Sequence, residues 1–192
     1  TLHKVYGEAM ALLVGDYLLT YAFEVMANAV GLGREQRLQM IKIMAMRAGA
    51  PGMIGGQVID IESEGKEIDE ETLLQMHDGK TSALLSACFE CGSLAAGYPP
   101  TPLLLSIGKD LGLAYQFQDD LLDATSTTAL LGKRAGGDST KKKPTAISIY
   151  GLAKTQEKLD QLEQSIAQKL AQLPNQGKAL TLLINHIFQR KS

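Results

Sequence analysis

Apolar residues recur at helical spacing along almost the whole chain. Between Arg34 and Arg47, for example, Leu38, Ile41 and Met44 follow one another at intervals of three residues. Such spacing places side chains on one face of an α-helix. No stretch alternates between apolar and polar residues in the manner of a half-buried strand. The pattern predicts an all-α fold with helices over residues 8–26, 34–47, 53–63, 81–92, 103–123, 146–173 and 178–190, and one more that Asp69 caps.

Two segments interrupt the helical pattern. Residues 98–102 read Tyr-Pro-Pro-Thr-Pro and form a connector, because proline cannot continue a helix. Residues 125–144 are polar and rich in Gly and Lys, which predicts a loop longer than a helical bundle needs. A loop of this length in a compact domain is usually functional or disordered.

Composition and charge narrow the classes of function. The chain has 192 residues, of which 45% are hydrophobic and 21% charged, and its net charge is −2. Residues 1–192 therefore suit one globular domain, or a large piece of one. The small net charge favours neither nucleic acid nor an acidic membrane surface as a partner. Charges and glycines interrupt the apolar stretches before the roughly 18 residues of a spanning helix, so we expect no stable membrane insertion.

The chain also lacks the pattern of a secretory signal peptide. It begins at Thr1 instead of Met, so a preceding targeting segment would not be seen in this sequence. Cys88 and Cys91 form a C-x-x-C within a predicted helix, without the second pair or the strand context of a zinc or redox site. We expect two buried, reduced thiols and a cytoplasmic protein.

Three carboxylates share one face of the helix that precedes the long loop. At about 100° per residue, Asp119, Asp120 and Asp123 fall within an arc of roughly 100°, and Gln116 falls inside the same arc. A solvated acidic stripe is one interpretation. Apolar neighbours such as Phe117 indicate instead that the helix is largely buried, and buried carboxylates need partners. The pattern favours a site for Mg2+, which takes oxygen ligands and bridges to substrate phosphates.

A basic residue opens another predicted helix. Gly79-Lys80-Thr81 looks like the end of a phosphate-binding loop, but Leu74 stands where that pattern needs glycine and no strand precedes it. The nucleotide-binding interpretation therefore fails. Lys80 remains a good candidate for a phosphate contact, and a surface lysine is the alternative.

The long loop combines glycines with lysines in Gly132-Lys133 and Lys143-Pro144-Thr145. Glycine lets a backbone wrap closely around a ligand, and lysine adds positive charge. A basic loop without a ligand is the alternative. Its run of three lysines is too short to indicate nucleic-acid binding.

Adjacent glycines mark a fourth candidate position. Gly55 and Gly56 each cost a helix about 1 kcal/mol relative to alanine. They therefore indicate either a close helix crossing or a substrate that approaches the backbone. Gln57 and Asp60 share a helix face next to them. Together, the four elements suit Mg2+, phosphate oxygens and an apolar substrate.

In this order, the elements closely resemble the trans-isoprenyl diphosphate synthases, the farnesyl and geranylgeranyl diphosphate synthase family. The resemblance covers essentially the whole chain and is carried by Tyr6-Gly-Glu-Ala, Gly15-Asp16, Gly55-Gly56-Gln57 with Asp60, Lys80-Thr81, Gln116-Phe-Gln-Asp-Asp-Leu-Leu-Asp123, Gly132-Lys133, Gly137-Asp138 and Lys143-Pro144-Thr145. It implies a bundle of antiparallel helices around a central cavity, of the isoprenoid synthase type, usually as a homodimer.

The resemblance also implies an activity: Mg2+-dependent condensation of isopentenyl diphosphate with an allylic diphosphate to a farnesyl or geranylgeranyl product. By the same resemblance, the allylic diphosphate would be held by Lys80, Lys133 and Lys143, and Mg2+ by Asp119 and Asp123 with Asp120 beside them. Thr81 and Gln116 would direct oxygen dipoles at the developing allylic cation. Gln57 and Asp60 would line the cavity, Asp60 through metal-bound waters.

The match is to the C-terminal two-thirds of the family pattern. The family's first aspartate-rich motif, the Arg pair after it and the helices before it would lie upstream of Thr1, so the domain is expected to be N-terminally incomplete and this chain alone inactive. Either a longer protein supplies these parts or the chain is a truncated paralogue, and the intact remaining motifs favour the former. Gly79 departs from the family pattern and would loosen the start of its helix.

Two other functions use similar residues. A non-catalytic regulatory subunit of the same family would lack working aspartate motifs, whereas Asp119, Asp120 and Asp123 are all present. A terpene cyclase shares the chemistry and the fold class. The Gly132-Lys133 and Lys143-Pro144-Thr145 elements fit chain elongation better than cyclisation.

Overall fold

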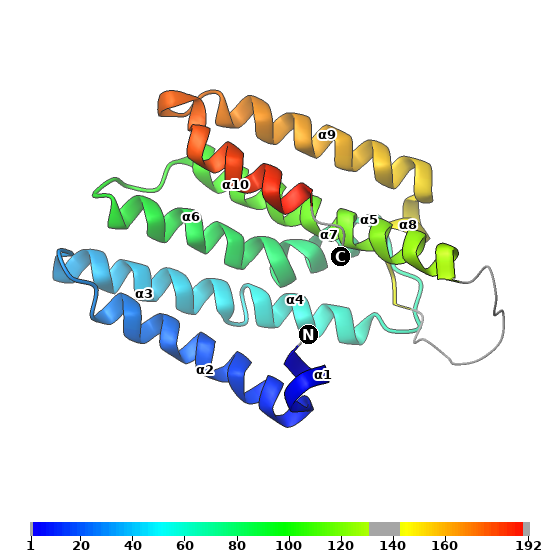
Figure 1. Ribbon diagram of the computed structural model, residues 1–192, viewed down its shortest axis with the longest axis horizontal. Helices are drawn as coiled ribbons and strands as arrows, with labels where there is room; N and C mark the ends of the chain where they lie inside the picture. Colours follow the sequence, from blue (N-terminus) through cyan, green and yellow to red (C-terminus); the bar gives the residue numbers. More distant parts are fainter. Residues whose placement is uncertain (1, 131–142, 190–192) are drawn as a thin grey trace.

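Helices make up all the regular secondary structure in the part of the chain that the computed structural model describes, residues 2–130 and 143–189 (Figure 1). The predicted all-α class is therefore confirmed. In chain order the elements are α1 (Leu2–Tyr6), α2 (Glu8–Ala27), α3 (Arg34–Ala48), α4 (Met53–Glu62), α5 (Glu70–His77), the π-helix η1 (Asp78–Ser82), α6 (Ala83–Ala95), α7 (Pro102–Leu130), α8 (Ala146–Tyr150), α9 (Leu152–Leu170), the 3-10 helix η3 (Pro174–Gly177) and α10 (Lys178–Phe188).

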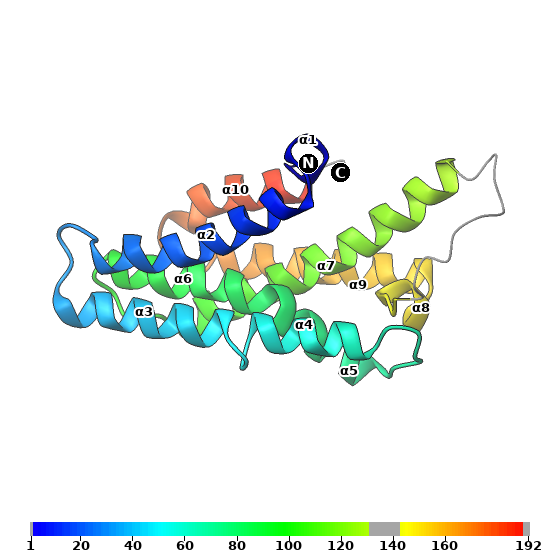
Figure 2. The same ribbon diagram turned by 90° about the horizontal axis from the view of Figure 1, so that it is seen from below.

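The long helices run roughly along one axis, and α7 lies at the centre of the bundle (Figures 1 and 2). It packs against α6 on one side and α9 on the other, and α6 in turn packs against α3. Helix α2 lies outside this arrangement and contacts α1 and α3. In this packing, η1 contacts both α4 and α7.

The main core forms around α7. Its residues Ile107, Leu111, Ala114 and Phe117 are almost completely buried and recur at helical spacing. They pack with apolar side chains of α5, α8, α9 and α10. A second, smaller cluster around Met40 joins α2, α3 and α6. Burial of these side chains is the main favourable contribution to folding.

Most predicted helix boundaries agree with the structure to within a few residues. Asp69 caps α5 as expected, because its Oδ1 accepts a hydrogen bond of 2.8 Å from the backbone N–H of Thr72. The predicted loop from Thr125 was wrong at its start, since α7 continues to Leu130. No Gly or Pro interrupts residues 124–130, so the helix can extend through this polar stretch.

Two further expectations need correction. The helix predicted over residues 146–173 is divided into α8 and α9 by Gly151, whose φ of 76° is left-handed. Cys91 is half-buried, but Cys88 is exposed although both thiols were expected to be buried. Both cysteines are free.

Helix α2 also differs from expectation. Among the described residues it is one helix of 20 residues whose best 18-residue window has a mean hydropathy of 1.4, which is long and apolar enough to cross a membrane. Gly15 and Asp16 interrupt the apolar run, but an average over 18 residues absorbs them. Only 6% of that window is buried. The finding rests on length and composition alone, properties that core helices and signal sequences share.

Candidate functional site

The site forms where η1 passes between two helices at very close range. A Cβ added to Gly56 of α4 would lie 2.1 Å from the backbone nitrogen of Lys80. On the other side, a Cβ at Gly112 of α7 would lie 2.4 Å from the Ser82 Oγ. Backbones can approach this closely only where a side chain is missing. Gly56 therefore supports the helix-packing interpretation of the double glycine, and this packing brings Lys80 beside α4.

The π-helix itself contains Gly79. A Cβ at this position would meet the Gly56 Cα at 2.9 Å. The widened turn over Asp78–Ser82 joins α5 to α6, at the position where the sequence indicated a loosened helix start. Such π-turns are frequent at functional sites.

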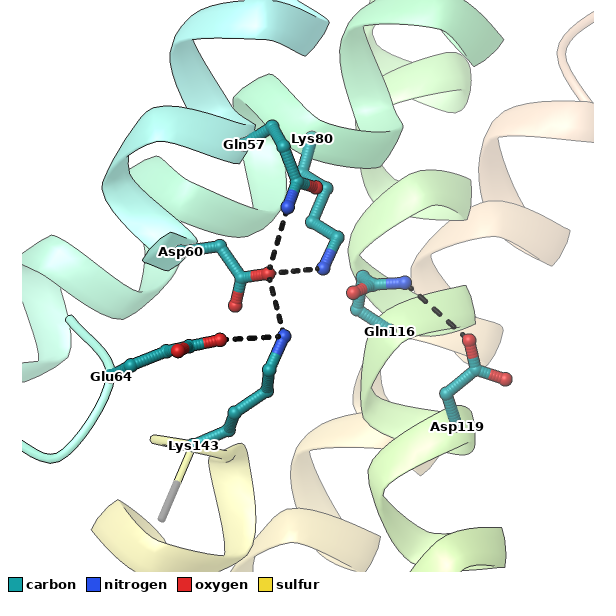
Figure 3. Close-up of polar contacts among 7 residues, drawn as sticks. All are labelled: Gln57, Asp60, Glu64, Lys80, Gln116, Asp119 and Lys143. Carbon is teal, nitrogen blue, oxygen red and sulfur yellow. Dashed lines mark hydrogen bonds and ion pairs between the residues drawn. The ribbon is translucent and has the colours of Figure 1, made fainter. Parts of the chain in front are cut away.

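Four charged groups and one amide converge beside this crossing (Figure 3). Asp60 Oδ2 accepts hydrogen bonds from Lys80 Nζ at 2.7 Å, from Lys143 Nζ at 3.3 Å and from Gln57 Nε2 at 3.3 Å. Lys143 Nζ also lies 3.4 Å from Glu64 Oε1. The cluster therefore joins three segments that are distant in sequence: α4 with its C-terminal turn, η1, and the segment before α8.

The electrostatics of the cluster follow from the burial of Asp60. Its side chain is only 4% exposed, and burial alone would raise the pKa of this carboxyl. Hydrogen bonds and charge from Lys80 and then Lys143 outweigh burial and hold the pKa of Asp60 below its usual range. For Lys143 burial works to lower the pKa, but Asp60 and then Glu64 raise it above the ordinary value. Asp60 and Lys143 are both charged at neutral pH.

Two predicted residues of α7 face the same region. Gln116 Nε2 lies 3.5 Å from Asp119 Oδ2, at the limit of a hydrogen bond. Figure 3 shows the Lys80 side chain pointing into the space between Asp60 and Gln116. Thr81 lies in η1 next to Lys80 and is half-buried. The structure thus brings together most of the residues that the sequence singled out on separate helices.

Asp120 has a different environment from its neighbours. Its Oδ2 accepts a hydrogen bond of 2.6 Å from the backbone N–H of Ala146, the first residue of α8. Burial raises the pKa of Asp120 to about 6, the Ala146 N–H opposes this shift, and the negative charges of Asp119 and Asp123 add to it. This carboxylate holds α8 against α7.

Asp119 and Asp123 are the other two carboxylates of the predicted metal site. They lie one helical turn apart, Asp119 half-buried and Asp123 exposed. Within the residues that the structure describes, no group of three or more His, Cys, Asp or Glu could hold a metal ion. Two carboxylates suit Mg2+, which usually keeps several waters and takes further oxygen ligands from substrate phosphates.

Lys133 lies outside the described residues, as do Gly132, Gly137 and Asp138. Sequence reasoning missed Glu64, whose carboxylate meets Lys143. Its spacing of four residues from Asp60 was the available signal, because that spacing is one helical turn. The contact between Asp120 and Ala146 had no signal in the sequence.

The geometry of the site can be compared with known proteins. A family model described as polyprenyl synthetase matches residues 1–183. The chain belongs to the polyprenyl synthetase family. Among curated proteins, it is 38% identical to the farnesyl diphosphate synthase of Escherichia coli (strain K12), over 99% of this chain and 66% of that protein. It is 35% identical to the chloroplastic geranylgeranyl pyrophosphate synthase of Catharanthus roseus, over 99% of this chain and 55% of that protein.

Solved structures of other polyprenyl synthetases agree with the fold. A geranyltransferase from Helicobacter pylori, complexed with magnesium and isoprenyl diphosphate, is 30% identical with a TM-score of 0.80. That match covers 99% of this chain and 64% of the other. The chain therefore spans two thirds or less of the length of these relatives.

Proposed function

We propose that this polyprenyl synthetase chain forms part of a magnesium-dependent prenyltransferase. The enzyme would condense isopentenyl diphosphate with an allylic diphosphate to a farnesyl or geranylgeranyl product. The observation that carries the proposal is the convergence of Lys80, Lys143 and Gln57 on Asp60, beside Gln116 and Asp119 of α7. Membership of the family and the names of its relatives support the same activity.

The lysines are assigned to diphosphate binding. The Lys80 and Lys143 side chains are 32% and 47% exposed, so their ammonium groups can be reached by a ligand. Charge-assisted hydrogen bonds from ammonium groups suit phosphate oxygens. Lys133 belongs to the same group by its sequence motif, and Gln57 would line the site next to Lys80.

Asp119 and Asp123 would hold the magnesium ions, with Asp120 beside them, and the bound metal would neutralise charge on the departing diphosphate. Asp120 would act by orienting α8 and Lys143, because its carboxylate accepts a hydrogen bond from the first amide of α8. The similar geranyltransferase structure, which is complexed with magnesium and isoprenyl diphosphate, supports magnesium and a diphosphate as ligands of this fold.

The remaining chemistry falls to neutral groups. As the bond between the allylic carbon and the diphosphate oxygen breaks, the oxygens of Gln116 and Thr81 would face the developing cation and stabilise it. The double bond of isopentenyl diphosphate then supplies the electron pair for the new carbon–carbon bond, and a proton leaves, for which the departing diphosphate is the acceptor. A dry, apolar interior would keep water from the cation.

The test is a turnover assay with the product of the whole open reading frame that encodes these residues. Labelled isopentenyl diphosphate is supplied with dimethylallyl or geranyl diphosphate and Mg2+, and we expect farnesyl or geranylgeranyl diphosphate. The 192 residues alone are expected to give none. Failure of the whole product, together with stimulation of a second prenyltransferase, would favour the regulatory subunit instead.

We also propose a cytoplasmic homodimer. Helix α2 supports association because it leaves large apolar side chains exposed, among them Met10, Leu13, Tyr17 and Leu18. Light scattering of the purified protein would give twice the monomer mass. A monomeric, monodisperse species at micromolar concentration would contradict this part of the proposal.

A further inference from the structure

Asp60 occupies an unusual position for a site that binds an anion. Its carboxylate is almost completely buried, and one of its oxygens accepts from both lysines that are assigned to diphosphate binding. A third donor, Gln57 Nε2, meets the same oxygen at 3.3 Å. One carboxylate oxygen thus receives the donors that would otherwise be directed at a phosphate oxygen.

The charges of the cluster cancel. Lys80 and Lys143 supply two positive charges, and Asp60 and Glu64 supply two negative charges. A diphosphate without a metal ion therefore meets no net positive charge in this cluster, and it meets the carboxylates of α7 nearby. A diphosphate that arrives with magnesium has much of its charge already neutralised, so the repulsion is smaller.

Asp60 nevertheless leaves the lysines accessible. The Asp60 side chain is 4% exposed, against 32% for Lys80 and 47% for Lys143. An ammonium group has three N–H donors, so each lysine can keep Asp60 on its inner side and bind a ligand on its outer side. The carboxylate therefore fixes where the two ammonium groups lie and at the same time weakens their attraction for an anion.

We propose that Asp60 is a positioning residue that makes diphosphate recognition depend on a bound metal ion, because it holds Lys80 and Lys143 together and cancels their charge. The inference rests on the proposed function of the site. It assigns to Asp60 a selectivity between metal-bound and metal-free diphosphate, in addition to a place in the wall of the site.

The test is calorimetric titration of inorganic pyrophosphate into the wild-type protein and the Asp60→Asn variant, once with Mg2+ and once with EDTA. The variant should bind metal-free pyrophosphate about tenfold to a hundredfold more tightly than the wild type, because the lysines lose a charge-assisted partner. Its affinity for magnesium pyrophosphate should change much less. The dissociation constant for metal-free pyrophosphate, divided by that for magnesium pyrophosphate, should therefore be at least about tenfold smaller in the variant than in the wild type.

Glu62→Gln is the matched control. Glu62 is an exposed carboxylate on the same helix, two residues from Asp60, and its substitution removes the same charge. We expect the ratio in this variant to equal that of the wild type. Circular dichroism and thermal unfolding establish that each variant is folded.

A second measurement needs no variant. Lysine acylation followed by peptide mass spectrometry reports the reactivity of Lys80 and Lys143 in the wild-type protein. Magnesium pyrophosphate should protect both lysines, and pyrophosphate with EDTA should leave their labelling rates unchanged. Equal protection by both forms would overturn the inference.

The remaining outcomes separate the inference from the proposed function. If Asp60→Asn weakens binding equally with and without magnesium, Asp60 has a structural role only and the inference is overturned. If the wild-type protein does not bind magnesium pyrophosphate at all, the proposed function of the site fails, and the inference fails with it.

Discussion

Lys80 and Lys109 carry the same charge in very different surroundings. Lys80 is held by the buried Asp60, whereas Lys109 is 63% exposed and pairs with the exposed Asp78 at 3.3 Å. Lys80→Met should reduce turnover about a hundredfold to a thousandfold, because one preorganised donor to the leaving group is lost. Lys109→Met should change it little, since an exposed ion pair contributes about 0–1 kcal/mol. Steady-state kinetics on both variants, made in the product of the whole open reading frame, compare the two losses. Equal losses would contradict the assignment of Lys80.

His77 is another residue whose environment departs from its type. It is 2% exposed and makes an edge-to-face contact with Phe117 at 5.9 Å between ring centroids. Burial lowers the pKa of His77 from 6.5 to about 4, with a further decrease from the charge of Lys80 that Asp60 opposes. The folded protein therefore keeps this imidazole neutral over a pH range in which the unfolded chain takes up a proton.

This difference predicts a loss of stability in acid. The folded-state pKa is the lower one, so the contribution of His77 is fully present above pH 6.5 and is lost as the pH falls towards 4. Between these limits the wild-type protein should lose up to about 3 kcal/mol more free energy of unfolding than His77→Leu. Urea unfolding at a series of pH values measures the difference. Parallel profiles for the two proteins would show that His77 does not cause it.

The sequence indicates which residue types belong to the candidate site, but not which of them contact one another. Lys80, Gln116 and Asp119 were singled out because their spacing and neighbours are informative within one helix. The Lys80–Asp60 pair joins residues 20 positions apart, and it depends on the close approach of α4 and η1. The sequence showed that a close approach near Gly56 was possible, but not which element would make it.

The contact between α4 and η1 should be highly sensitive to substitution. Gly56→Ala would place a methyl group against the Lys80 backbone, so the elements must separate. We expect a loss of about 1–3 kcal/mol in the free energy of unfolding, as for other overpacked cores, and weaker binding of magnesium pyrophosphate. Chemical denaturation and calorimetry measure the two effects.

Gly92→Ala provides the control for this substitution. Gly92 lies in α6, and a Cβ there would meet no atom within 4 Å. Alanine should therefore stabilise the helix by about 0.5–1 kcal/mol and leave pyrophosphate binding unchanged. Similar effects of the two alanines would contradict a close contact between α4 and η1.

Helix existence was predictable and helix ends were less so. The buried positions Ile107, Leu111 and Phe117 of α7 repeat every three or four residues, so its type was clear. The polar residues that follow Asp123 carry no such repeat. They also contain no Gly or Pro that would end the helix, so the sequence did not indicate whether α7 continues to Leu130. Gly151 is the opposite case, because one glycine ended a strong helical pattern by adopting a left-handed φ.

Magnesium and diphosphate should act together on the stability of the folded protein. A ligand that binds only the folded state at a hundred times its dissociation constant adds about 2.7 kcal/mol. For a chain of this size, that corresponds to an increase of about 5–10 °C in melting temperature. Differential scanning calorimetry with magnesium and pyrophosphate should show this increase, and EDTA should reverse it. Stabilisation by pyrophosphate that EDTA does not reverse would contradict a metal-bridged site.

The two parts of the site, on α7 and before α8, differ in how firmly they are held in the fold. Asp119 extends from α7, whose neighbouring turns are buried between α6 and α9. Lys143 precedes α8, a helix of five residues whose first amide is held by the Asp120 side chain. Amide hydrogens in the buried turns of α7 should therefore exchange with solvent only on global unfolding, and those of α8 through local opening. Bound diphosphate would slow amide exchange mainly in α8. The part of the site that opens more readily, Lys143 and α8, would therefore close onto the diphosphate, and the part on α7 would already be in place.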